Sequence, residues 1–133
     1  MKRLLSLLLV SAASLFATEV PTLTPAEAAK LVAEGKAVLV DVREPAEWAE
    51  TGVAAPAVLL PKSEFDAGKV GDWKDFLAKV GDKQIITYCR AGRRAGAVAE
   101  ALAKEGHKTA NAGTLKAWQE AGLPTRPSPA PAK

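Results

Sequence analysis

The stretch IITYCRAGRRAGAVAEAL, residues 85–102, decides the fold that we expect for this chain of 133 residues. It begins with β-branched and aromatic residues, turns at Gly92, and ends in apolar residues spaced for a helix. A strand that leads directly into a helix is the repeating unit of parallel α/β sheets. Ligands bind such sheets beyond the carboxyl ends of the strands, so we expect the turn after Tyr88 to lie at a binding edge.

Alternating segments on both sides of this stretch repeat the pattern. Thr24 to Glu27 form a capping box, which predicts a helix that starts at Pro25 and is closed by Gly35. Further helices are predicted from Pro45, from Trp73, over 94–105 and from Leu115, and strands over 37–40, 58–60, 85–88 and 108–110. The expected fold class is α/β, with a parallel sheet of about five strands flanked by helices on both faces.

The ends of the chain differ from this central part. Residues 1–17 have basic residues, a short apolar run and then small residues, which is typical of a secretory signal peptide. The apolar run is shorter than the ~20 residues that span a bilayer, so we expect export to the periplasm without a stable membrane anchor. Residues 18–123 are the expected domain. The four prolines within 124–133 predict an extended, disordered tail.

The charge balance says little about partners once the signal peptide is set aside. Residues 1–17 hold two of the 18 basic residues and none of the 15 acidic ones, so the remainder has a formal charge of +1. The sequence contains no stripe of basic residues that would indicate nucleic-acid binding. We expect a monomer without a cofactor. One histidine and one cysteine do not make a metal site.

Cys89 is the single cysteine, and the residues after it favour a chemical role. A short turn between a strand and a helix directs backbone N–H groups inward, and the helix adds the positive end of its dipole. The turn combines small residues with positive charge, and its members are Arg90, Ala91, Gly92, Arg93 and Arg94. We therefore expect a stabilised thiolate at Cys89 that solvent can reach. A buried structural cysteine is the alternative.

Three motifs resemble those of the rhodanese family of single-domain sulfurtransferases. The first is the six-residue loop C-x4-R from Cys89 to Arg94. The second is D-V-R-E at 41–44, and the third is G-x4-W-x3-G-L-P at 113–124. The three occur in the family's order and span most of residues 22–125.

The resemblance implies a role for each matching residue. Cys89 would carry sulfur as a persulfide, taken from a donor such as thiosulfate and passed to a thiophilic acceptor such as cyanide or a thiol. The backbone N–H groups of residues 90–94 would surround the anionic sulfur, and Arg94 would close the loop. Asp41 would support the loop through an ion pair, although a carboxylate at a strand end could also be a general acid.

Two other functions remain compatible with this loop. Phosphatases and arsenate reductases of the same fold tend to have a loop one residue longer, which surrounds a tetrahedral oxyanion. A non-catalytic sulfur carrier would use the same chemistry at Cys89 and deliver its sulfur to a partner protein.

Overall fold

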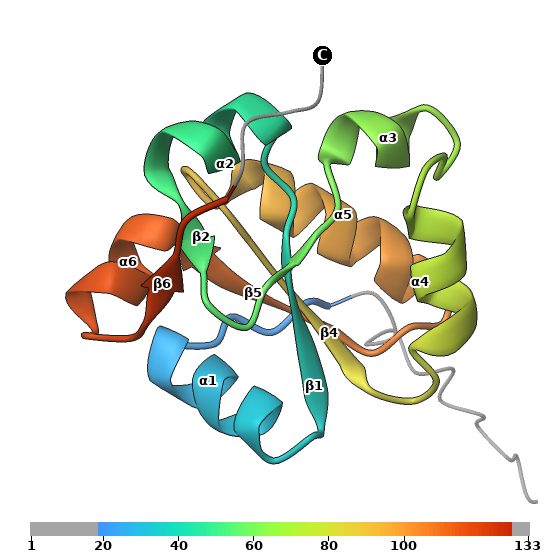
Figure 1. The fold of residues 1–133 in the computed structure, drawn as a ribbon. Helices are drawn as coiled ribbons and strands as arrows, with labels where there is room; N and C mark the ends of the chain where they lie inside the picture. The colour runs from blue at the N-terminus through green and yellow to red at the C-terminus, as the bar shows by residue number, and fades with distance from the viewer. Residues whose placement is uncertain (1–18, 129–133) are drawn as a thin grey trace, which may run out of the picture.

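The computed structural model describes residues 19–128, which are built on a central parallel sheet (Figure 1). Its strands lie in the order β3, β1, β4, β5, with bounds Val58–Leu59, Ala37–Asp41, Gln84–Cys89 and Thr109–Thr114. Thr22 adds a single parallel bridge to Asn111 at the outer edge of β5. The α/β class is confirmed, and the main sheet has four strands rather than the expected five or so.

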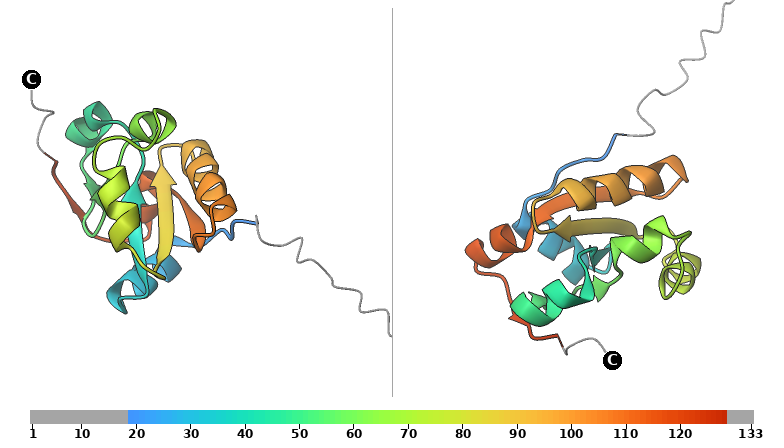
Figure 2. Two further views of the ribbon diagram at one scale, coloured as in Figure 1. Left: turned by 90° about the vertical axis from the view of Figure 1, so that its right-hand side faces the viewer. Right: turned by 90° about the horizontal axis from the view of Figure 1, so that it is seen from above.

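Helices cover both faces of this sheet, as Figures 1 and 2 show. On one face, α1 and α6 pack against Leu39, Ile86 and Ala110. On the other, α3, α4 and α5 pack against Val40 and Ile85. The bounds of these five helices are Pro25–Ala33, Leu115–Glu120, Lys62–Asp66, Trp73–Lys79 and Arg93–Lys104. The remaining helix, α2 (Pro45–Thr51), follows the carboxyl end of β1.

Strand β4 is buried along its whole length, and its side chains alternate between the two apolar clusters. Ile86 and Tyr88 belong to the cluster under α1 and α6, whereas Ile85 and Cys89 belong to the cluster under α5. This alternation follows from the period of two in an extended chain. It places Cys89 as the last residue of β4, with its side chain directed toward α5.

Local signals in the sequence locate most of the elements. The capping box at α1 has both of its hydrogen bonds, with Thr24 and Glu27 as partners. The three tryptophans, Trp48, Trp73 and Trp118, are all buried. Strand β3 is shorter and more exposed than expected, because it forms the edge of the sheet. Helix α3 lies between the strand predicted at 58–60 and the helix predicted from Trp73, where the sequence predicts no element.

The prediction of a disordered tail from Pro124 onward is wrong for residues 124–128. There, β6 (Thr125–Arg126) pairs antiparallel with β2 (Val53–Ala54). Proline lacks an N–H group but keeps its carbonyl, and the Pro124 oxygen accepts from Ala55 N at 2.9 Å and from Trp118 Nε1 at 2.8 Å. The predicted signal peptide and the rest of the predicted tail lie outside the described residues.

Between residues 19 and 128, no helix is long and apolar enough to cross a membrane.

Candidate active site

The turn between β4 and α5 surrounds the sulfur atom of Cys89 with backbone N–H groups. Gly92 N donates to Cys89 Sγ at 3.0 Å, and Ala95 N donates at 3.4 Å. Gly92 has a φ of +88°, which glycine adopts without steric cost, and this conformation tightens the turn. Ala95 lies in the first turn of α5, whose N–H groups have no partner within the helix. The positive end of the helix dipole therefore faces the sulfur.

The thiol is closed off from solvent in this conformation. Cys89 has no exposed surface, whereas Arg90, Ala91 and Arg93 beside it are exposed. Our expectation of a solvent-accessible thiol is therefore wrong for this conformation. The reason is the tightness of the turn, because the amides approach the sulfur itself and leave no open space between them.

Arg94 is held by Glu47 of α2 rather than by Asp41. Its Nη1 and Nη2 donate to the two carboxylate oxygens of Glu47, at 2.6 and 2.9 Å. The hydrogen bond from Arg94 lowers the pKa of Glu47 to about 2. In turn, the bond to Glu47, and to a lesser extent the nearby Cys89 sulfur, raises the pKa of Arg94. This ion pair joins α2 to the first turn of α5.

The predicted ion pair between Asp41 and the loop is wrong. Asp41 is completely buried and accepts from Arg43 Nε at 3.1 Å and from Arg43 Nη2 at 2.8 Å. Arg43 also donates to Thr51 Oγ1 and to the carbonyl oxygen of Gly52, both at 2.8 Å. Arg43 lies two residues after Asp41 in the chain. Its guanidinium, rather than that of a loop arginine, therefore contacts the Asp41 carboxylate.

Asp41 has no exposed surface and Arg43 donates to both of its carboxylate oxygens, an environment that does not suit a general acid. Burial and the neighbouring Asp41 charge raise the pKa of Tyr88, whose hydroxyl accepts from Ala54 N at 2.9 Å. Asp41, Arg43 and Tyr88 thus form an interior polar network that ties β1 and β4 to the chain around residues 51–54. The network is structural.

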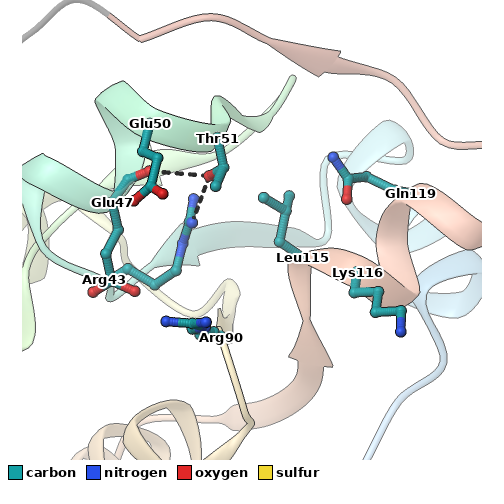
Figure 3. A pocket seen from close by; sticks show the side chains of 8 residues that line it. All are labelled: Arg43, Glu47, Glu50, Thr51, Arg90, Leu115, Lys116 and Gln119. Atoms are coloured by element: carbon teal, nitrogen blue, oxygen red, sulfur yellow. Dashed lines mark hydrogen bonds between the residues drawn. The ribbon is translucent and has the colours of Figure 1, made fainter.

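A cavity of about 430 Å³ opens beside the turn, between α2 and α6 (Figure 3). In the figure, residues of and next to α2 face residues of α6 across the cavity, and Arg90 lies below Arg43. The lining side chains carry both signs of charge; they are Arg43, Glu47, Glu50, Thr51, Arg90, Leu115, Lys116 and Gln119. Among these, Arg90 directly follows Cys89 in the chain, so the cavity lies next to the turn.

A rhodanese-like domain model matches residues 24–121, which is most of the chain. The chain belongs to the rhodanese-like domain family. An uncharacterized Synechocystis protein, slr1261, is 30% identical over 106 residues, which are 78% of this chain and 55% of that protein. This chain therefore spans about half the length of that relative.

Two solved structures resemble this rhodanese-like domain along most of their length. A polysulfide-sulfur transferase homodimer from Wolinella succinogenes has a TM-score of 0.64 at 26% identity, covering 84% of this chain and 82% of that one. A Rhodopseudomonas palustris protein of unknown function, described as a possible tyrosine phosphatase, has a TM-score of 0.66 at 26% identity, with coverages of 80% and 85%. The family thus supports a sulfur-transfer type of role.

The sequence predicts the turn of this rhodanese-like domain but not three of its contacts. Glu47 lies in the same short stretch of sequence as Asp41, and nothing local distinguishes the two carboxylates as partners of a loop arginine. Ala95 lies one residue beyond the predicted donors, and Asn111 contacts the turn from another strand, β5. Within residues 19–128 no group of three or more His, Cys, Asp or Glu side chains could hold a metal ion.

Proposed function

We propose that this chain is a sulfurtransferase that carries a sulfane sulfur as a persulfide on Cys89. One observation carries the proposal: Cys89 Sγ accepts hydrogen bonds from Gly92 N at 3.0 Å and Ala95 N at 3.4 Å at the start of α5. Amide donors and a helix dipole that converge on one sulfur atom stabilise negative charge there. A structural cysteine needs neither.

Thiosulfate is the donor that we propose. The Cys89 thiolate attacks the outer sulfur of thiosulfate, a new S–S bond forms, and the old S–S bond breaks so that sulfite leaves with its electron pair. A thiophilic acceptor, such as cyanide or a thiolate, then attacks the terminal sulfur and regenerates the Cys89 thiolate. This is covalent catalysis in two steps, and it requires no cofactor.

The size of the turn favours sulfur over a phosphate ester. Gly92 N contacts the Cys89 sulfur directly, and the six-residue loop from Cys89 to Arg94 is one residue shorter than the loops that tend to surround a tetrahedral oxyanion on this fold. The Wolinella sulfur transferase supports the same choice. The Rhodopseudomonas structure is described as a possible tyrosine phosphatase, so phosphate-ester hydrolysis is the alternative function to be tested alongside sulfur transfer.

The buried thiol adds a requirement to the mechanism. A donor can reach Cys89 only when the exposed side chains and backbone of the turn move aside, with the cavity beside Arg90 as the adjacent entrance. We therefore expect iodoacetamide, a small reagent, to alkylate Cys89 in the folded protein. A thiol that reacts only on unfolding would overturn the proposal.

Intact-mass spectrometry after incubation with thiosulfate tests the function directly. We expect a mass gain of one sulfur atom in the wild type, its loss on addition of cyanide with release of thiocyanate, and neither in Cys89→Ser. Persulfide formation without turnover by small acceptors would identify a sulfur carrier rather than an enzyme. Phosphomonoester turnover that is lost in Cys89→Ser would replace sulfur transfer with phosphatase chemistry.

We also propose that the protein acts after export, on small-molecule donors and acceptors. The support is the signal-peptide pattern of residues 1–17. The intact mass of protein recovered from the periplasm tests this, and cleavage after Ala17 is the expected result. Protein that stays in the cytoplasm at full length would contradict it.

A further inference from the structure

We propose that Asn111 is a positioning residue for the turn, because it holds Gly92 so that the Gly92 amide points at the Cys89 sulfur; the proposal rests on the sulfurtransferase function given above. Asn111 Nδ2 donates to the carbonyl oxygen of Gly92 at 3.1 Å. The same oxygen accepts the first hydrogen bond of α5, from Gly96 N at 3.0 Å. The Gly92 N–H group therefore donates to the Cys89 sulfur, and the Gly92 carbonyl oxygen accepts from both Asn111 Nδ2 and Gly96 N.

The orientation of the Asn111 side chain follows from its two partners. Its Oδ1 accepts from Gly113 N at 2.8 Å. A backbone N–H can only donate and a carbonyl can only accept, so the amide group has one way to satisfy both. Gly96 leaves room for this contact, because a Cβ there would lie 3.3 Å from Asn111 Nδ2.

The backbone of Asn111 is itself held on both sides. Asn111 N donates to the Pro21 carbonyl at 2.9 Å, and the Asn111 carbonyl accepts from Leu23 N at 3.0 Å. On its other side Asn111 pairs with Thr87 of β4, immediately before a register shift that inserts an extra residue into β5. Such bulges redirect side chains. Residues 21–23, β4 and β5 thus hold the Asn111 backbone in place beside the turn.

The contact matters because glycine holds a backbone conformation weakly. At Gly92 no side chain restricts rotation, so the conformation that aims its amide at the sulfur has to be imposed from outside. Without the hydrogen bond from Asn111, the backbone of the turn can adopt more conformations. The hydrogen bond from Gly92 N to the Cys89 sulfur is then formed for a smaller fraction of the time. Removing one donor from an oxyanion site costs 10²–10³-fold in rate, and loosening one is expected to cost about tenfold.

Two variants isolate the bond to Gly92. Asn111→Asp keeps an acceptor for Gly113 N but replaces the donor with an oxygen that repels the Gly92 carbonyl. Asn111→Leu has nearly the same size, is neutral, and loses both bonds. The loss that the two variants share is the bond to Gly92. A change seen in both is therefore not an effect of the added charge.

Thr109→Val is the matched control. It removes a hydrogen bond from β5 to α5, Thr109 Oγ1 to the Ala99 carbonyl at 3.0 Å, that does not involve the turn. We expect the control to lower stability to urea while the rate of persulfide formation with thiosulfate stays at the wild-type value. We expect both Asn111 variants to lose about tenfold in that rate.

An NMR measurement separates the two proposals. The chemical shift of the Gly92 amide proton should move upfield in both Asn111 variants, because its hydrogen bond to the sulfur is formed less often. In Thr109→Val this chemical shift should be unchanged. Folded Asn111 variants with the wild-type rate and the wild-type Gly92 resonance would overturn the role of Asn111. Wild-type protein that forms no persulfide would overturn the sulfurtransferase function alone, since the Gly92 resonance still reports on Asn111.

Discussion

At the scale of the residue, the pair of hydrogen bonds between Arg94 and Glu47 connects the loop to α2. Both side chains are about one-quarter to one-third exposed, so water screens the pair only in part. We expect Glu47→Gln to lower the free energy of unfolding by about 1–2 kcal/mol, because a charged bidentate contact becomes a neutral one. Urea unfolding measures this. Glu50→Gln, an exposed position on the same helix, is the control, and an equal loss there would contradict the expectation.

The same pair predicts how stability depends on pH. The pKa of Glu47 is lowered from 4.5 to about 2 in the folded protein, so the folded state favours the ionised form. The stabilisation is fully present above the unfolded value of 4.5 and is lost as the pH falls through about 2. The stability difference between wild type and Glu47→Gln should therefore shrink over this window. A difference that persists at the acid end would assign it to packing instead of charge.

At the scale of the element, the short sheet of β2 and β6 attaches the end of the described chain to the domain. Arg126 donates to the carbonyl oxygens of Ala55 and Ala57 at 3.0 and 2.8 Å, and Pro124 accepts from Trp118. We expect truncation after Leu123 to cost about 2–4 kcal/mol, because it removes several part-buried hydrogen bonds at once. A chain that ends at Ser128 keeps all of them and is the control. Thermal unfolding of the two truncated chains tests the difference.

The elements that could be predicted are those with a local signal. α1 has a capping box, α4 and α5 have apolar residues at helical spacing, and β1 contains a continuous apolar run at 37–40. By contrast, β2 and β6 are two residues each and exist only because the chain brings them together across 71 positions at Arg126 and Ala55. α3 is five residues long, too short for a helical period to show.

The residues of the candidate site also fall into those that the sequence predicts and those that it does not. Cys89 and the turn after it could be located because a strand, a glycine and a helix follow one another in sequence. The partners of that turn could not, because Glu47, Asn111 and the cavity residues of α6 come from other elements. Asp41 and Glu47 have the same charge and lie six residues apart, and only packing decides that Arg43 takes the first and Arg94 the second.

At the scale of the whole molecule, the turn, α2 and α6 meet around one cavity at the carboxyl ends of the strands. The buried carboxylate of Asp41 is neutralised by Arg43, and Glu47 is neutralised by Arg94. Arg90 is exposed, and Lys116 is 83% exposed with only a distant contact of 3.8 Å to Glu120. These two exposed cations can act on an anion that approaches from solvent, and Glu50 is the one carboxylate lining the cavity that has no ion pair in the described residues.

This arrangement predicts that a dianionic donor such as thiosulfate is drawn to the cavity by charge. The rate of persulfide formation should fall as ionic strength rises, since salt screens exposed charges. We expect Arg90→Gln and Lys116→Gln each to lower that rate by about two- to fivefold at low salt and to flatten its salt dependence. Lys74→Gln, on the exposed surface of α4, is the matched control. An equal effect in all three variants would mean that net charge alone attracts the donor, and that the cavity is not its route to Cys89.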